Sequence, residues 1–171
     1  LDVRRYSPNS SFLTQTLGYT PVDGVGQEGL EAYFNKYLSG RNGTIVSETD
    51  RDGRDLAIGD EAYIPPVGGY HLVLAVDEGI QSFMEQAVQE AYVEQNATSA
   101  CGIAMDPKTG RILAIANYPD FDLNEVPRDD VPALTALTRN RVITDAYEPG
   151  STFKVVTLAS AIDSGVVNTG S

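Results

Sequence analysis

The chain has 171 residues, with 12 Lys and Arg against 24 Asp and Glu, so its formal net charge is −12. Nucleic acids and anionic membrane surfaces are bound largely through Lys and Arg, so this charge argues against both kinds of partner. Hydrophobic residues make up 42% of the chain and charged residues 21%, which excludes the class of weakly hydrophobic, disordered chains.

The sequence shows neither a membrane span nor a cluster of soft metal ligands. Its apolar runs are far shorter than the roughly 20 residues that cross a bilayer. Leu1 to Arg5 has neither an initiator Met nor a secretory pattern, so we expect the chain to begin inside a longer protein. One Cys and one His exclude an intramolecular disulfide and the usual zinc clusters, and leave open only a site made of carboxylates. The sequence predicts no cofactor and no bound metal.

The first third of the chain predicts a helix and a hairpin. Residues 1–24 are polar and rich in turn-forming residues, and no long element is expected there. From Gln27 to Leu38 apolar residues recur with the period of an amphipathic helix, which Gly40 ends. We expect three aromatic members of this stripe to lie in a core rather than in a ligand site: Tyr33, Phe34 and Tyr37. Between Gly43 and Asp60, short β-branched pieces broken by Asp-Gly and Gly-Asp pairs predict a hairpin.

A domain boundary is predicted near Pro65-Pro66 and Gly68-Gly69, which divides the chain into 1–68 and 69–171. Beyond it, His71 to Val76 is almost wholly apolar and predicts a strand covered on both faces. Asp77 is a good N-cap for the helix that follows. The apolar residues at helical spacing in that helix are Ile80, Phe83, Met84, Ala87, Val88, Ala91 and Tyr92.

The middle of the second part predicts an antiparallel hairpin. Two apolar strands, 99–105 and 111–117, flank a Pro- and Gly-bearing turn at 106–110. We expect the strand at 71–76 to lie in or beside the same sheet. Residues 118–132 are rich in Pro and Asp and predict a surface loop, and 150–164 predicts a helix that Gly165 ends.

The chemistry of the chain centres on Ser151 and Lys154. Pro149-Gly150 places Ser151 at the start of a helix, where residues three apart share a face and have Cβ atoms roughly 5–6 Å apart. An uncharged Lys154 amine could then remove the proton of the Ser151 hydroxyl and make it a nucleophile. A lysine serves this role only if burial and nearby positive charge lower its pKa, and Phe153 and Val155 are expected to supply apolar surroundings. Taken alone, Ser-x-x-Lys occurs in many chains by chance.

Further motifs accompany this pair in one order along nearly the whole chain. They are Gly26 to Glu31, Tyr37 to Gly40, His71 to Asp77 with Ile80-Gln81, Ile112 to Pro119 with Phe121-Asp122 and Asn124, Asn140-Arg141, and Pro149 to Lys154. The ordered set resembles the class B penicillin-binding proteins. The resemblance implies an α+β fold: a pedestal, dimerisation-type segment at 1–68, then the N-terminal portion of a serine β-lactamase-like transpeptidase domain with an antiparallel sheet at 69–171.

By this resemblance Ser151 is the acylated nucleophile and Lys154 its general base. The family joins a D-alanyl-D-alanine stem peptide to an amine on another peptidoglycan strand, and β-lactams imitate that substrate. The implied partners are the stem peptide, β-lactam antibiotics and other cell-wall or division proteins. The implied parent is anchored in the bacterial cytoplasmic membrane, with this region outside. The alternative is a non-catalytic pedestal or scaffold module, or a β-lactam sensor that keeps the serine only for acylation.

The chain also departs from the family. A Ser-x-Asn element and a Lys-Thr-Gly strand follow the nucleophile in the family, whereas here Lys108-Thr109-Gly110 precedes it and predicts only a turn. We therefore expect this chain by itself to be inactive.

Structural roles are expected for most other polar and reactive residues. We expect His71 to be a packing or surface residue and Cys101 to be a small core residue. Arg139 and Arg141 are expected to pair with carboxylates near the Ser151 helix, while Asp145 has no assignable role. Solvated loop charge is expected at 50–55 and at Asp129-Asp130.

Overall fold

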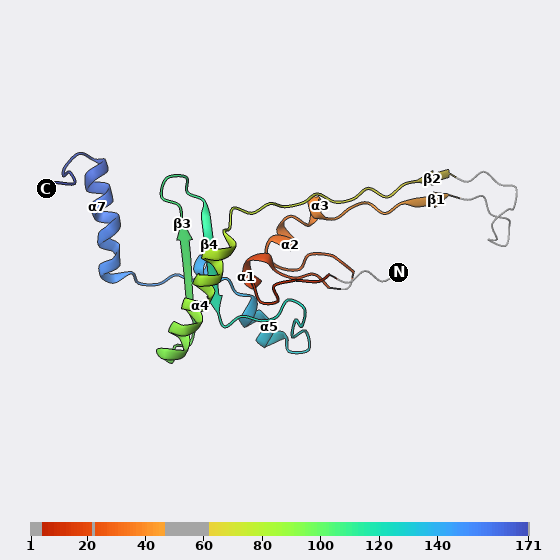
Figure 1. Ribbon diagram of the computed structural model, residues 1–171, viewed down its shortest axis with the longest axis horizontal. Coiled ribbons are helices and arrows are strands. Elements are labelled where there is room, and N and C mark those ends of the chain that lie inside the picture. The colour runs from red at the N-terminus through yellow and green to blue at the C-terminus, as the bar shows by residue number, and fades with distance from the viewer. Residues whose placement is uncertain (1–4, 22, 47–61, 171) are drawn as a thin grey trace, which may run out of the picture.

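Three parts follow one another along the long axis of the molecule (Figure 1). A narrow arm lies at one end, a body of helices around a hairpin lies in the middle, and a single helix stands apart at the other end. The computed structural model describes residues 5–21, 23–46 and 62–170. Ser151 lies in the turn just before this separate helix, and Lys154 is the first residue of the helix. In the described structure, the candidate site is therefore connected to the body only by the segment that precedes Ser151.

The predicted hairpin in the second part of the chain is confirmed and forms the centre of the body. Strand β3 (Ala100–Met105) pairs antiparallel with strand β4 (Ile112–Tyr118). In the turn, the carboxylate of Asp106 accepts hydrogen bonds from the Thr109 hydroxyl at 2.6 Å and from the Lys108 backbone N–H at 2.9 Å. These bonds hold the pKa of Asp106 below its ordinary value. The Lys-Thr-Gly triplet is thus part of a turn, as expected.

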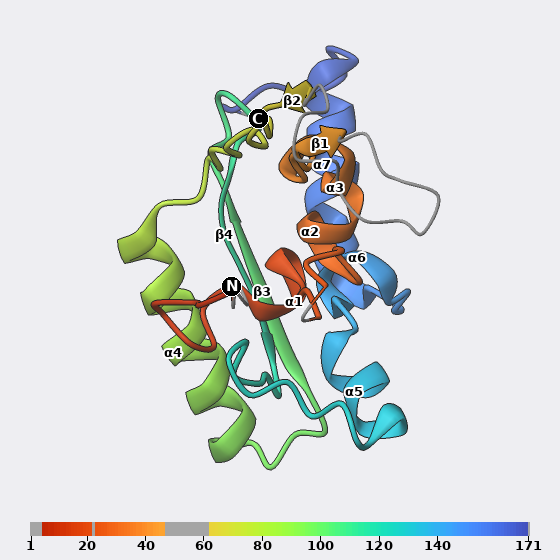
Figure 2. The same ribbon diagram turned by 90° about the vertical axis from the view of Figure 1, so that its right-hand side faces the viewer.

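Helix α4 (Glu78–Glu94) covers one face of this hairpin (Figure 2). Asp77 caps it as predicted, since its carboxylate accepts from the Ile80 backbone N–H at 3.0 Å. Only part of the predicted apolar stripe faces the strands: Val88 is buried, whereas Phe83 is 76% exposed. The two-stranded sheet covers only the side of α4 that carries Gln81 and Val88. The prediction that the whole apolar stripe lies in the core was therefore wrong at Phe83.

The opposite face of the hairpin is contacted by α1 (Thr14–Leu17) and α6 (Arg141–Thr144), with α5 (Val131–Thr138) beside them (Figure 2). Helix α5 begins within the stretch expected to be a surface loop. Its N-cap is Asp130, whose carboxylate accepts from the Ala133 backbone N–H at 3.0 Å. Asp130 is therefore a cap rather than merely solvated charge.

The arm and its base occupy the first part of the chain. The single helix predicted over 27–38 is instead two short helices, α2 (Gly29–Tyr33) and α3 (Asn35–Leu38), which break at Phe34. Strand β1 (Thr44–Val46) pairs antiparallel with β2 (Ala62–Ile64), so the second strand lies beyond the hairpin predicted over 43–60. The turns predicted there, and the charges at 50–55, lie outside the described residues.

Two predictions of core packing were wrong. Tyr33 is 79% exposed and Tyr37 is also exposed, while Phe34 between them is half-buried. The three rings contact one another, with centroids 4.8 Å apart for Tyr33 and Phe34 and 6.4 Å apart for Phe34 and Tyr37. Cys101 is exposed, because alternate residues of β3 face away from α4, and α6, which contacts β3 on that side, leaves the Cys101 side chain uncovered.

The predicted strand at 71–76 does not form. A strand requires backbone hydrogen bonds to a neighbouring strand. Among the described residues, the hairpin makes one such bond at the end of this segment, from the Asp77 N–H to the Leu113 carbonyl at 2.9 Å. Val73 is 90% exposed. Within the described ranges, no helix has both the length and the apolar character needed to cross a membrane.

Candidate active site

Ser151 and Lys154 lie one turn apart on one helical segment. Ser151 belongs to the 3-10 turn η1 (Gly150–Phe153), and Lys154 is the first residue of α7 (Lys154–Asp163). The Lys154 backbone N–H donates to the Ser151 carbonyl, which is the i to i+3 bond of a 3-10 turn. In such a turn, side chains at i and i+3 lie above one another. The two side chains therefore share a face, which is the arrangement that proton transfer between them requires.

Among the described residues, no side chains from other elements enclose Ser151 and Lys154. Ser151 and Lys154 are both exposed, and Val155 is 72% exposed. Apart from η1, no described element packs against α7, which stands clear of the body (Figure 1). The apolar surroundings expected from Phe153 and Val155 are thus not formed, because neighbouring residues on one helix cannot enclose each other.

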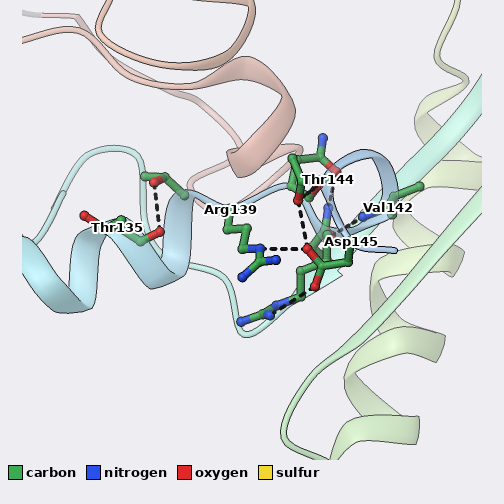
Figure 3. Close-up of polar contacts among 9 residues, drawn as sticks. Thr135, Arg139, Val142, Thr144 and Asp145 are labelled. Atoms are coloured by element: carbon green, nitrogen blue, oxygen red, sulfur yellow. Dashed lines mark hydrogen bonds and ion pairs between the residues drawn. The ribbon is translucent and has the colours of Figure 1, made fainter. Parts of the chain in front are cut away.

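The segment that enters the Ser151 turn is held at Asp145 (Figure 3). Its carboxylate accepts from Arg139 Nε at 2.7 Å and lies 3.6 Å from Arg141 Nη1, and the Thr144 hydroxyl donates to it at 2.9 Å. Desolvation raises the pKa of Asp145, but the hydrogen bonds from Thr144 and Arg139 and the two arginine charges outweigh it and leave the pKa below its ordinary value. The expectation that both arginines pair with a carboxylate is confirmed, and Asp145, to which no role was assigned, is that carboxylate.

A buried amide pair fixes the same segment to the body. Asn117 Nδ2, on β4, donates to Asn140 Oδ1 at 3.0 Å, and Asn117 Oδ1 accepts from the Val142 backbone N–H at 3.2 Å. Asn140 Nδ2 also lies 3.4 Å from the Thr16 hydroxyl of α1. Asn117 was predicted only as the last residue of an apolar strand. A polar residue at the end of such a run is the one sequence signal that could have pointed to this junction.

Nearby, Gln15 gives the junction a second anchor from the N-terminal segment. Its side-chain nitrogen donates to the carbonyls of Pro119 and Leu137, each at 3.1 Å. Gln15 is buried, and its oxygen accepts from the Thr14 hydroxyl at 2.8 Å. Residues separated by more than 100 positions are thereby joined in one polar network.

The remaining candidates lie apart from this site. A cavity of about 830 Å³ lies between the N-terminal segment and residues 123–128, and Ser151 and Lys154 are not among its lining residues. His71 is exposed. The described residues contain no group of three or more His, Cys, Asp or Glu side chains placed to hold a metal ion.

Comparison with known domain families and proteins agrees with the motif order. Residues 2–74 match the penicillin-binding protein dimerisation domain, and residues 100–171 match the penicillin-binding protein transpeptidase domain. The chain belongs to the class B penicillin-binding proteins. The α+β fold expected from the sequence, a pedestal part followed by the start of a transpeptidase domain with an antiparallel sheet, is confirmed.

Relatives of known name cover nearly all of the chain. Stage V sporulation protein D of Bacillus subtilis (strain 168) is 36% identical over 167 residues, which are 98% of this chain and 25% of the relative. Peptidoglycan D,D-transpeptidase FtsI of Escherichia coli (strain K12) is 35% identical over 164 residues, which are 96% of this chain and 27% of the relative. The chain thus spans about a quarter of the length of these curated relatives.

Solved penicillin-binding proteins share the fold. Penicillin-binding protein 3 of Mycobacterium tuberculosis has a TM-score of 0.74 and 27% identity, over 96% of this chain and 34% of that one. Penicillin-binding protein 2X of Streptococcus thermophilus has a TM-score of 0.68 and 28% identity, over 94% of this chain and 25% of that one.

Proposed function

We propose that this chain is the pedestal-to-transpeptidase region of a serine-type peptidoglycan D,D-transpeptidase. The observation that carries the proposal is the placement of Ser151 and Lys154 one helical turn apart, within the residues that match the transpeptidase domain. The relatives named D,D-transpeptidases support the same reaction class.

In the proposed reaction Ser151 acts as the nucleophile and Lys154 as the base. The Ser151 Oγ attacks the carbonyl carbon of the D-alanyl-D-alanine bond while the neutral Lys154 amine takes its proton. The C–N bond then breaks, the proton passes to the departing D-alanine amine, and an ester to Ser151 remains. An amine from a second stem peptide attacks this ester, forms the cross-link and restores the serine hydroxyl. A β-lactam would acylate Ser151 by the same attack on its ring carbonyl.

The proposal extends to location and partners. Such an enzyme works on peptidoglycan, and therefore outside the bacterial cytoplasmic membrane, held there by an anchor in another part of the protein. Its ligands are the stem peptide and β-lactam antibiotics. Other cell-wall or division proteins are further candidate partners, and one structural neighbour is a complex between penicillin-binding protein PBP2 and MreC from Helicobacter pylori.

Labelling of the full-length protein with a fluorescent penicillin tests the proposal. We expect stoichiometric acylation at Ser151 by intact-mass and peptide spectrometry, and its loss in Ser151→Ala. Lys154→Ala should slow acylation by about 10²-fold or more, as expected for the loss of a general base. Ser160→Ala, an exposed serine of the same helix, is the matched control and should label normally. Acylation at another residue would remove Ser151 from the proposed role.

A further inference from the structure

We propose that Asp145 is a positioning residue for Ser151: it fixes the point at which the chain leaves the body to enter the Ser151 turn. This inference rests on the proposed function, because it concerns the rate at which Ser151 is acylated. Asp145 is not proposed to touch the substrate. It would act through the six-residue connection that leads to Ser151.

Asp145 is the last residue before Ser151 whose side chain is bonded to another part of the described chain. Ala146, Tyr147 and Glu148 are exposed and form no hydrogen bond or ion pair in the described structure. Beyond them, η1 and α7 bond only within their own segment among the described residues. Among the described residues, the position of Ser151 relative to the body is therefore set where Asp145 is held.

Two arginines that precede Asp145 on the same segment hold its carboxylate. Figure 3 shows Arg139 beside Asp145. Arg139 lies between α5 and α6, and its Nε donates to Oδ1 at 2.7 Å, while Arg141 opens α6 and approaches Oδ2 at 3.6 Å. The side chains of Asp145 and Arg141 are only about a third or less exposed, at 32% and 25%. A charge-assisted bond of this kind is stronger than one between neutral groups.

The partners of Asp145 are themselves fixed. Asn140 lies between the two arginines, is 9% exposed and bonds to Asn117 of β4. The Val142 backbone N–H donates to the same Asn117 side chain. The hairpin thus already holds the segment on which the arginine–aspartate contact forms. That contact fixes the chain as far as Asp145, five residues beyond Asn140.

Loss of the contact would lengthen the free connection to Ser151. With the Asp145 side chain held, six residues lead from it to Ser151. Without that contact Asp145 keeps only its backbone bond at the end of the four-residue helix α6, from its N–H to the Arg141 carbonyl at 3.2 Å. When this helix end opens, the last bond to the body is at Val142, nine residues from Ser151. At about 3.3–3.6 Å for each extended residue, the reach of the tether grows from about 20 Å to about 30 Å. A larger accessible volume lowers the fraction of time in which Ser151 lies at the geometry needed for attack, and misplacement by about 1 Å costs about 10²-fold in rate.

The test measures acylation of the full-length protein by a fluorescent penicillin over a range of concentrations, which separates initial binding from the acylation step. We expect Asp145→Ala to slow the acylation step by about 10- to 100-fold with initial binding changed less than about threefold. Asp145→Asn keeps an oxygen that accepts from Arg139 and Thr144, and should recover part of the rate. Asp129→Ala removes one exposed carboxylate without a partner in the described chain and is the matched control.

A double-mutant cycle tests the same contact without Asp145→Ala, in case that variant folds poorly. Arg139→Gln and Asp145→Asn, singly and together, should show non-additive effects on the acylation step, because each removes the same charge pair. Rates are compared well below each variant's unfolding temperature. Equal acylation steps in the wild type and all Asp145 variants would overturn the inference while leaving Ser151 as the nucleophile. Failure of the wild type to label would instead overturn the proposed function.

Discussion

Gln81 pairs with the backbone of Ile115 as a neighbouring strand would. Its side-chain nitrogen donates to the Ile115 carbonyl at 2.9 Å, and its side-chain oxygen accepts from the Ile115 N–H at 2.8 Å. Gln81 is fully buried, and its nitrogen also donates to Glu85 at 2.7 Å. The same Glu85 oxygen accepts from the Leu13 backbone N–H at 2.9 Å. One amide of α4 thus joins the helix to the edge of β4 that is not paired with β3 and, through Glu85, to the N-terminal segment.

Gln81→Leu should destabilise the protein by about 2–4 kcal/mol. The substitution leaves the buried N–H and carbonyl of Ile115 without partners, and each unsatisfied buried group costs about 1–3 kcal/mol. Urea unfolding measures the difference. Gln86→Leu, at an exposed position of the same helix, is the control and should change stability by less than about 0.5 kcal/mol. Equal losses in both variants would contradict the role assigned to Gln81.

Gly102→Ala should destabilise the contact between α4 and β3. A Cβ at this position would lie 2.5 Å from Met84 Sδ and 3.3 Å from a Val88 methyl carbon, so Met84 must shift. Overpacking of this kind costs about 1–3 kcal/mol. In a Met84→Ala background the same change should cost much less, and unfolding of the four proteins of the cycle measures the coupling. Gly68→Ala, where a Cβ meets no atom within 4 Å, is the control. Additive losses would show that Met84 is not the obstacle.

The parts of the fold that short-range patterns determine were predicted correctly. The Asp106 turn, the two strands beside it and the Asp77 cap depend on residues within a few positions of one another. The predictions of a strand at 71–76 and of a core position for Cys101 were wrong. Apolar character shows that a side chain can be buried, but it does not show that another part of the chain packs against it. The break at Phe34 has no signal in the apolar period, which continues through it.

In the candidate site, too, the sequence predicts the features that depend on nearby residues and misses those that depend on distant ones. The placement of Ser151 and Lys154 one helical turn apart follows from their three-residue spacing, while their roles as nucleophile and base stay a prediction. Asp145 was missed as a partner of Arg139 because the pairing depends on how the chain turns between α5 and α6. The junction of Asn117, Asn140 and Thr16 joins residues more than 20 and more than 120 positions apart, and neither composition nor periodicity reports such contacts.

Asp120→Asn should become relatively more stabilising as the pH rises. Burial raises the pKa of Asp120, and hydrogen bonds from its own backbone and from Ser11 offset this only in part. Because the folded pKa lies above the unfolded one, the protonated form contributes stability below the unfolded value of about 3.9, and this contribution is lost as the pH rises through the folded pKa. The variant should therefore gain in unfolding temperature relative to wild type between pH 3 and pH 7. Asp129→Asn, at an exposed position, is the matched control; a pH-independent difference for Asp120→Asn would contradict the assignment.

The 171-residue chain, isolated from the rest of the protein, should show negligible acylation by a fluorescent penicillin. Ser151 and Lys154 share a helical face, but both are exposed, and no described element beyond η1 packs against α7. Nothing in the described ranges therefore supplies a second donor for the developing oxyanion or a groove that positions the ligand. Loss of one oxyanion donor typically costs about 10²–10³ in rate, and loss of positioning removes much of the proximity effect as well. Intact-mass spectrometry of the chain and of the full-length protein, treated identically, makes the comparison. Stoichiometric labelling of the isolated chain at Ser151 would show that the helical pair is sufficient without the missing surroundings.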